Sequence, residues 1–279
     1  MKSNIDISSK PICVFDSGLG GLTVVRDLAK SMPGEDIIYL GDSARVPYGI
    51  KSLATVRKFA LEDAKFLSRF DPKMLVIACN TASAAAYETL NQALEIPVID
   101  VIRPSAAKAI QTTDKSIGIV ATEATVRSGA YQTQVASRDP KREVLAVACP
   151  LLVPIVEEGR PQNDPIVAHV LCDYLRDLQR MRPGALVLGC THYPLLAGAI
   201  SKLMGPETKL ISSAEAAAEM VEQNLNKNSL RNSNKTGGKL ICYTTDNPER
   251  FAELGKRFAQ RELDEVYYVG TDELEKLNT

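Results

Sequence analysis

The sequence predicts an α/β protein of two similar domains, each with a parallel-rich sheet flanked by helices. Short apolar segments alternate with segments of helical spacing along the chain, which is typical of parallel strands joined by crossover helices. Two apolar segments, MLVIACNTAS at 74–83 and LVLGCTHYPLL at 186–196, share one feature, a strand that ends in a cysteine. This repetition favours domains related by a pseudo-two-fold axis, with an active site in the cleft between them.

The composition agrees with this class. A chain of 279 residues corresponds to about two domains, and 45% hydrophobic residues are usual for a globular protein. The formal net charge is −1 with acids and bases interspersed, which argues against nucleic acid as the main partner. The first ten residues are polar and no apolar run approaches about 20 residues, so we expect a cytoplasmic protein without a membrane span.

The cysteines and histidines do not form a metal or disulfide pattern. Six cysteines are scattered without C-x-x-C spacing, which argues against a disulfide framework or a zinc ribbon, and we expect most of them to be reduced and buried. The two histidines, His169 and His192, lie outside any H-E-x-x-H pattern, so a transition-metal site lacks its usual ligands. We therefore expect no metal.

The first part of the chain alternates strands and helices. The apolar segment 12–15 has the length of a strand, and a glycine-rich turn leads from it into helical spacing at 23–32. Residues 42–49 lack periodicity and contain many turn formers, which predicts an ordered loop over the strand ends. The remaining elements predicted here are strands at 37–40, 74–78 and 98–101 and helices at 52–70 and 81–94, with Pro97 and Pro104 marking a boundary.

The alternation continues in the second part. Ser212 and Glu215 fit a capping box that opens a helix at 214–225, and residues 226–238 are so polar that we expect an exposed loop. The further elements predicted are strands at 117–120, 144–148, 186–189, 210–211, 239–244 and 266–269, and helices at 122–135, 165–181, 195–204 and 248–259. We interpret Cys149, Cys172 and His169 as structural, because their surroundings are apolar or helical.

Taken singly, the polar residues at the strand ends are weak evidence of function. The turn at 16–21 exposes backbone N–H groups that suit a carboxylate or phosphate, but no G-K-[ST] follows, and a tight turn explains it equally well. A cysteine after an apolar strand is more often a small buried hydrophobe than a base. Asn80 and Thr81 weaken that interpretation for Cys79, because a structural cysteine needs no amide and hydroxyl at a helix start.

Five motifs in order give a stronger signal. FDSGLGGLT, GDSARVPYG, CNTA, ACPLLVP and GCTHYP occur in this sequence from residue 15 to residue 194. Together they resemble the aspartate/glutamate racemase family over most of the chain. The resemblance implies cofactor-independent racemisation of L-glutamate and D-glutamate by proton transfer at Cα between two cysteines, supplying D-glutamate for peptidoglycan synthesis. It also implies that the chain crosses back, so that residues 1–102 and 213–279 form the first domain and residues 103–212 the second.

The chemistry requires two acid/base groups on opposite faces of Cα. A free thiol has a pKa near ~8.5 and is a few per cent thiolate at neutral pH, so each thiol needs help from its surroundings. Candidate catalytic residues are Cys79 with Asp16 as its helper, and Cys190 with His192 and Glu157 as its helpers. The resemblance places Asp16 and Glu157 beside their thiols, whereas by default Glu157 would belong to a solvated turn.

The substrate carries two carboxylates and an ammonium group, so the site must offer hydrogen-bond donors. We expect recognition by neutral groups, since few basic residues lie in the motifs. The resemblance implies that Ser17 holds the substrate and that Tyr48 and Gly49 line the pocket. The full set of candidate substrate-binding residues is Asp16, Ser17, Tyr48, Gly49, Asn80, Thr81, Thr191 and His192.

Two other interpretations stay open. One is an aspartate racemase or another two-cysteine isomerase of the family, although the histidine after C-T favours glutamate. The other is a two-lobed protein that binds a dicarboxylate without turning it over. The expected partners are L-glutamate and D-glutamate, with no cofactor, and a homodimer is a candidate assembly.

Overall fold

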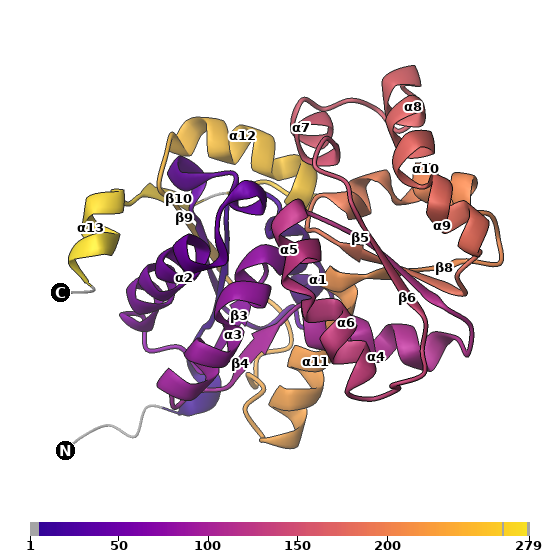
Figure 1. Cartoon of the computed structure of the whole chain (residues 1–279). Coiled ribbons are helices and arrows are strands. Elements are labelled where there is room, and N and C mark those ends of the chain that lie inside the picture. Colours follow the sequence, from indigo (N-terminus) through magenta and orange to yellow (C-terminus); the bar gives the residue numbers. More distant parts are fainter. Residues whose placement is uncertain (1–5, 264, 278–279) are drawn as a thin grey trace, which may run out of the picture.

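The computed structural model describes residues 6–263 and 265–277 (Figure 1). In these residues the strands form two separate sheets, one of six strands and one of four, and all neighbouring strands within them are parallel. Helices flank both sheets, so the predicted α/β class is confirmed. Among the helices in these ranges, none has the length and apolarity needed to cross a membrane.

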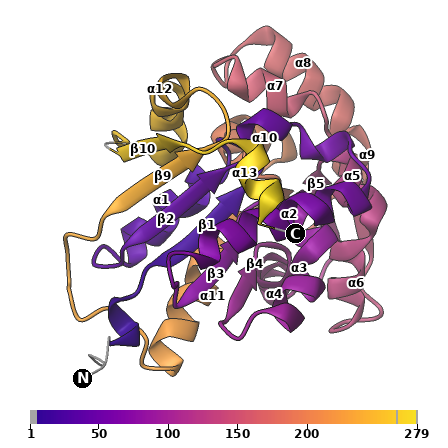
Figure 2. The ribbon, with the colours of Figure 1, turned by 90° about the vertical axis from the view of Figure 1, so that its left-hand side faces the viewer.

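The larger sheet has the strand order β10-β9-β2-β1-β3-β4. Its strand β1 (Ile12–Asp16) is apolar up to its last residue and buried throughout, as expected for a parallel strand covered on both faces. Figure 2 shows that strands from the end of the chain lie beside strands from its beginning. The other strands are β2 (Ile37–Gly41), β3 (Met74–Ile77), β4 (Val98–Asp100), β9 (Leu240–Thr244) and β10 (Glu265–Tyr268).

Two apolar cores cover the two faces of the larger sheet, because successive side chains along a strand point to opposite faces. Val14 and Tyr39 belong to the core that also contains side chains of the helices α1 (Leu22–Ser31), α11 (Ser213–Lys227) and α12 (Pro248–Ala259). Cys13 and Phe15 belong to the core on the other face. Its helices are α2 (Leu53–Ser68), α3 (Asn80–Ala93) and α13 (Thr271–Lys276).

The smaller sheet has the order β6-β5-β7-β8. Its strands are β5 (Ile117–Ala121), β6 (Val144–Ala148), β7 (Ala185–Gly189) and β8 (Lys209–Ser212). One face carries α4 (Ile102–Thr112), α5 (Glu123–Ser128) and α6 (Ala130–Ala136). The other face packs on α7 (Leu152–Glu157), α8 (Pro165–Tyr174), α9 (Arg176–Met181) and α10 (Ala197–Met204), in the same core that contains α1 and α12.

The chain passes between the sheets twice. It leaves the larger sheet after β4 through α4 and returns from β8 through α11, and α11 packs on both α1 and α4. Since β9 then pairs with β2 and β10 pairs with β9, we propose the domain boundaries that the resemblance implied, 1–102 with 213–279 and 103–212.

Several helices differ from the sequence prediction. The predicted helix at 122–135 is broken at Gly129, which has a φ of 67° in the left-handed region, and the one at 165–181 is broken at Leu175. The helices α4 and α7 were not predicted. Pro104 was interpreted as marking a boundary, and no element was assigned around Pro154. Each proline is the third residue of its helix, where a missing N–H costs no internal hydrogen bond. The helix α13 was also missed.

The cysteines largely follow the prediction. Cys13, Cys79, Cys149, Cys190 and Cys242 are buried and free, as expected. Cys172 and His169 are exposed on α8, so they face water rather than the core. The predicted N-cap is confirmed, since the Ser212 hydroxyl accepts a hydrogen bond from the Glu215 N–H.

Candidate active site

The carboxyl ends of β1, β3, β5 and β7 meet around a cavity of about 330 Å³. This volume suits a small-molecule ligand. The cavity lies between the two sheets, and one cysteine from the end of a strand in each sheet lines it. The lining residues are Ser17, Gly18, Val46, Pro47, Tyr48, Gly49, Ile50, Cys79, Asn80, Thr81, Thr122, Glu123, Pro150, Val153, Pro154, Glu157, Cys190, Thr191 and His192.

Cys79 follows β3 and caps the N-terminus of α3. Its Sγ accepts a hydrogen bond from the Ala82 N–H at 3.4 Å and donates one to the Ser17 hydroxyl at 3.8 Å. Burial, with a smaller contribution from the negative charge of Asp16, raises the pKa of the Cys79 thiol to about 12. The thiol therefore rests protonated at neutral pH and is poised as an acid.

Asp16 ends β1 and lies fully buried behind the cavity wall that Ser17 and Gly18 form. Its Oδ2 accepts hydrogen bonds from the N–H groups of Gly18 at 3.1 Å and Gly21 at 2.9 Å. Its Oδ1 is buried without a hydrogen-bond partner among the described residues. Burial raises the pKa of this carboxyl above its usual value. Asp16 is thus held rigidly beside Cys79, with one oxygen uncommitted.

The glycines after Asp16 allow a close approach of the backbone. A Cβ on Gly21 would clash with Asp16 and lie 2.7 Å from the Tyr39 hydroxyl oxygen, and one on Gly20 would clash with Thr191 across the cleft. The glycine-rich turn therefore serves packing between the two halves of the molecule around this site, rather than a phosphate cradle.

Cys190 follows β7 and has a different set of neighbours. Its Sγ lies 3.8 Å from the Nδ1 atom of His192, and the Nε2 atom of His192 lies 3.0 Å from Glu157 Oε1. Burial alone would lower the pKa of His192, but the contacts with Cys190 and Glu157 outweigh it and raise that pKa to about 10. The edge-on ring of Phe258, 5.3 Å away between centroids, covers the imidazole. The three side chains therefore form a continuous line of contacts from solvent to the Cys190 thiol.

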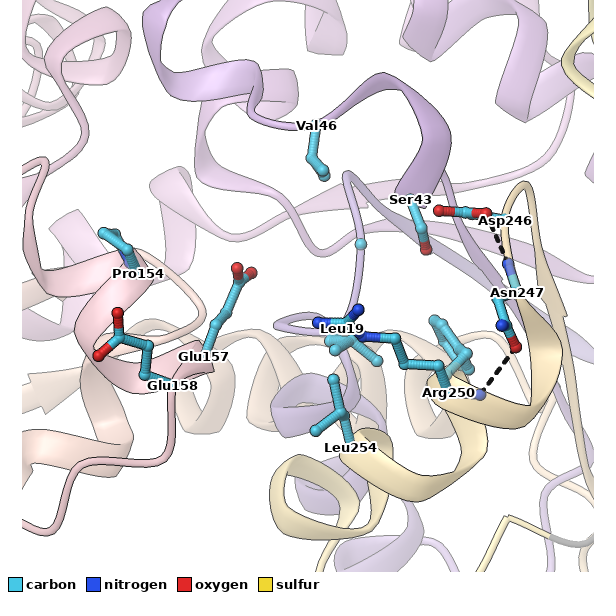
Figure 3. A pocket seen from close by; sticks show the side chains of 12 residues that line it. Leu19, Ser43, Val46, Pro154, Glu157, Glu158, Asp246, Asn247, Arg250 and Leu254 are labelled. Carbon is cyan, nitrogen blue, oxygen red and sulfur yellow. Dashed lines mark hydrogen bonds between the residues drawn. The ribbon is translucent and has the colours of Figure 1, made fainter.

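Glu157 reaches this line of contacts from the end of α7, the helix that was not predicted. Figure 3 shows that the carboxylates of Glu157 and its neighbour Glu158 point in different directions. Glu158 pairs with Arg160 at the surface, as a solvated turn would. Glu157 lines both the central cavity and the adjoining outer groove of Figure 3, whose far side is formed by α12. Both carboxylates are exposed to solvent, but only Glu157 also contacts His192.

The predicted substrate-binding residues differ in how free their polar atoms are. The hydroxyl of Tyr48 donates to Asp42, away from the cavity that its ring lines. Asn80 Oδ1 accepts a hydrogen bond of 2.7 Å from Tyr131. The Thr81 hydroxyl lies 2.9 Å from that of Thr122.

Thr191 and Gly49 also lie at the cavity wall. The Thr191 hydroxyl lies 3.4 Å from His192 Nδ1. Gly49 touches the other half of the molecule, where an added Cβ would lie 2.8 Å from Thr122 Cβ.

The sequence analysis missed several lining residues. Thr122 lines the cavity and directly follows β5, which extends one residue beyond the predicted strand 117–120. Its place at a strand end was therefore a usable signal. Val46, Pro150 and Val153 are apolar lining residues without such a signal. Within the described ranges, no three His, Cys, Asp or Glu side chains are grouped so that they could hold a metal ion.

Comparison with known proteins gives a consistent result. The sequence profile of the Asp/Glu/Hydantoin racemase family matches residues 21–221. The chain is 45% identical over 265 residues to the glutamate racemase of Geobacter metallireducens, covering 94% of this chain and 97% of that protein. It is 42% identical to the glutamate racemase of Syntrophus aciditrophicus, covering 93% and 96% of the two chains.

Solved structures agree with this similarity. A glutamate racemase of Bacillus anthracis superposes with a TM-score of 0.90 at 37% identity, covering 94% of this chain and 98% of that one. The enzyme of Francisella tularensis, solved in complex with D-glutamate, gives a TM-score of 0.88 at 41% identity, with 95% and 99% covered. An aspartate racemase of Picrophilus torridus shares 16% identity at a TM-score of 0.59, a likeness of fold alone.

Proposed function

The chain belongs to the Asp/Glu/hydantoin racemase family, and we propose that it interconverts L-glutamate and D-glutamate without a metal or an organic cofactor. The observation that carries the proposal is the pair of thiols, Cys79 and Cys190, that reach one cavity from the carboxyl ends of strands in different sheets. A carbon atom held between them would have an acid/base group on each face.

Each turnover moves one proton off Cα and another onto it. With D-glutamate, the Cys79 thiolate takes the Cα proton and the Cys190 thiol delivers its own proton to the opposite face. With L-glutamate the two thiols exchange roles. After either direction one sulfur has gained a proton and the other has lost one, so the next cycle requires proton exchange with solvent or neighbouring groups.

The helpers suit these steps. Since the Cys79 thiol rests protonated, it needs a proton acceptor before it can act as a base, and Asp16 with its uncommitted oxygen is the nearby carboxylate. The substrate ammonium, on binding, would stabilise the thiolate that results. His192 and Glu157 serve Cys190 in the same way, through the imidazole that contacts the sulfur.

Neutral donors would bind the substrate carboxylates. Ser17, Asn80, Thr81, Thr191 and the Gly49 N–H surround the cavity, and N–H groups at the start of α3 add a positive helix end. We place the reaction in the cytoplasm, where D-glutamate would enter peptidoglycan synthesis, and propose a homodimer as the assembly.

The decisive experiment follows the Cα proton in deuterated water. Early in the reaction the product should carry deuterium at Cα while the remaining substrate stays mostly unlabelled, because the delivering thiol holds a solvent-derived deuteron. Activity should survive chelation, and the protein should show no pyridoxal absorbance. A protein that only binds glutamate would never exchange this proton, and equal early labelling of both pools would contradict two separate bases.

Single substitutions assign the two thiols. Cys79→Ser and Cys190→Ser should each lower racemisation in both directions by about 100-fold or more, because a hydroxyl is a far weaker acid and base than a thiol. Each variant should still exchange the Cα proton of one enantiomer with solvent, namely the enantiomer whose Cα proton faces the remaining thiol. Cys149→Ala is the matched control, since this thiol is also buried and donates a hydrogen bond to the Val147 carbonyl oxygen at 3.6 Å. Loss of turnover in folded C149A would show that the thiols are wrongly assigned.

A further inference from the structure

The wall of the cavity opposite α7 is a loop, residues 42–50, without strand pairing of its own. It consists of two short 3₁₀ turns, Ser43–Arg45 and Tyr48–Ile50. Its second half lines the cavity from Val46 to Ile50 and touches Thr122 in the other half of the molecule. The geometry of the substrate site therefore depends on whatever fixes this loop.

The first half of the loop is tied to the end of β9. The Ala44 N–H donates to the Thr245 hydroxyl at 2.9 Å, and that hydroxyl donates to Asp42 Oδ1 at 3.0 Å. The Ser43 hydroxyl lies 2.9 Å from the Thr244 hydroxyl. None of these contacts reaches the cavity-lining half, which follows after Arg45.

The second half is tied through Tyr48. Its ring is buried, and its hydroxyl donates to Asp42 and lies 3.2 Å from Asp63 Oδ2. A phenol hydroxyl can donate one hydrogen bond, and here the Asp42 carboxylate accepts it. Tyr48 therefore contributes its ring and backbone to the cavity, while its hydroxyl fastens the loop to the two carboxylates.

Arg45 holds those carboxylates together. Its Nε donates to Asp42 at 2.7 Å and its Nη2 to Asp63 at 3.0 Å, while Nη1 contacts Glu62. The Arg45 side chain is 10% exposed, and the three carboxylates are fully buried. The guanidinium also lies 4.2 Å from the ring centroid of Phe59. Only a guanidinium offers donors in three directions from one plane, so lysine could not replace these contacts.

The cluster would be unstable without this cation. Burial raises the pKa values of Asp42 and Asp63, which means that their charged forms are costly where they are. Besides Arg45, a cation near them is the mostly exposed Lys58, whose Nζ lies 3.7 Å from Glu62. Removing the guanidinium would leave buried carboxylates without compensation, and they would separate or admit water.

We infer that Arg45 is a positioning residue of this active site. By joining Asp42, Glu62 and Asp63 it fixes the hydrogen-bond partners of Tyr48, and through Tyr48 it fixes the wall that presents the Gly49 backbone to the substrate. This inference rests on the proposed racemisation, but it concerns substrate binding and not the transfer of the Cα proton.

The test compares Arg45→Lys with Arg142→Lys. Arg142 is a matched control, because its side chain is 9% exposed, it pairs with Asp139 at 2.8 Å, and it donates to the carbonyl oxygens of Thr113 and Lys115. It lies near the opposite, amino-terminal end of β5. Both variants should lose thermal stability, and Arg45→Lys should lose more, because its partner carboxylates are fully buried and Asp139 is 31% exposed. Arg45→Lys alone should raise KM for both enantiomers about tenfold, with a smaller change in kcat, since a loosened wall weakens substrate binding.

Hydrogen exchange gives a second readout. Amide exchange in Arg45→Lys should be faster, and in Arg142→Lys at the parent rate, for Val46, Tyr48, Gly49 and Ile50. If Arg45→Lys does not fold, Tyr48→Phe decides, because it leaves the ionic cluster in place and cuts its link to the loop, and it should raise KM as well. Parent values of KM and loop exchange in the folded variant would overturn the inference. A parent protein that fails to racemise glutamate would instead contradict the proposed function.

Discussion

Cys79 and Cys190 both follow the carboxyl end of a strand but have unlike neighbours. Cys79 contacts the Ser17 hydroxyl and lies beside a buried carboxyl, whereas Cys190 contacts an imidazole that is linked to a half-exposed carboxylate. A thiol beside an imidazole can exchange its proton over a short path to solvent through Glu157. The buried Asp16 offers Cys79 no comparable path, so its proton must leave by way of the open cavity.

Glu157→Gln should test the relay to Cys190. The contact with Glu157 raises the pKa of His192, so its removal should lower that pKa from about 10. Activity that requires the imidazolium should then be lost at a lower pH than in the parent, and kcat/KM at neutral pH should fall about 10- to 100-fold. The measurement is the pH profile of kcat/KM. An unchanged alkaline limb would contradict the relay.

The sequence indicated both thiols and their polar neighbours, because each sits in a local motif at a strand end. It could not indicate that the Tyr48 hydroxyl points away from the cavity, since its acceptors Asp42 and Asp63 lie in different elements. Thr122 could have been found from its place directly after a strand. Its pairing with Thr81 could not, because that contact joins the two halves of the molecule and leaves no trace in local spacing.

At the scale of elements, the start of α4 depends on one buried acid. Asp100 ends β4, and its Oδ2 accepts hydrogen bonds from the N–H groups of Ile102 at 3.2 Å and Arg103 at 3.3 Å. These bonds satisfy donors that the first helical turn leaves open. Burial nonetheless dominates and raises the pKa of Asp100 to about 6. The ionised carboxylate is the better acceptor for these N–H groups, but burial makes it the more costly form.

Asp100→Asn should change how stability depends on pH. Because the pKa of Asp100 is higher in the folded state than in the unfolded state, the native protein binds the extra proton, and stability falls as pH rises from about 4 to about 6. Asparagine keeps an acceptor oxygen and cannot titrate. Relative to this variant, the parent should lose up to about 3 kcal/mol across that window. Urea unfolding at several pH values checks this, and parallel profiles would contradict it.

The prediction of helices failed where proline, which usually ends a helix, lies in its first turn. Pro104 was interpreted as marking a boundary, and no element was predicted around Pro154, yet each proline lies in the first turn of a helix. Leu175 gives no sequence signal for the break between α8 and α9, which is therefore set by packing. The strands were easier to predict, because continuous apolar runs are what a sheet covered on both faces requires.

At the scale of the molecule, buried polar contacts join the two halves beside the site. The Tyr131 hydroxyl on α6 donates to the Asn80 side chain at the start of α3. The Thr23 hydroxyl on α1 donates to the Thr191 carbonyl oxygen at 3.1 Å. These contacts align the strand ends that carry the two thiols, and only the long-range fold brings them together.

Tyr131→Phe should weaken this alignment. Asn80 Oδ1 would stay buried without its donor, which costs about 1–3 kcal/mol of unfolding free energy. Tyr193→Phe is a control within one half, since the Tyr193 hydroxyl donates to the Cys149 carbonyl oxygen at 2.8 Å. Both variants should lose similar stability in urea unfolding, and Tyr131→Phe should show the larger fall in kcat/KM. Equal kinetic effects would mean that the contact between the halves has no special role.

The symmetry of the reaction limits what the unlike surroundings of the two thiols can do to the kinetics. Mirror-image substrates have equal free energies in water, so kcat/KM for one direction must equal kcat/KM for the other, whatever Asp16 and the His192–Glu157 pair do. A preference for one enantiomer can then appear only as a faster turnover matched by weaker binding. The asymmetry of this site therefore governs the fraction of enzyme that is occupied at a given concentration of each enantiomer. It never changes the equilibrium ratio of the two enantiomers.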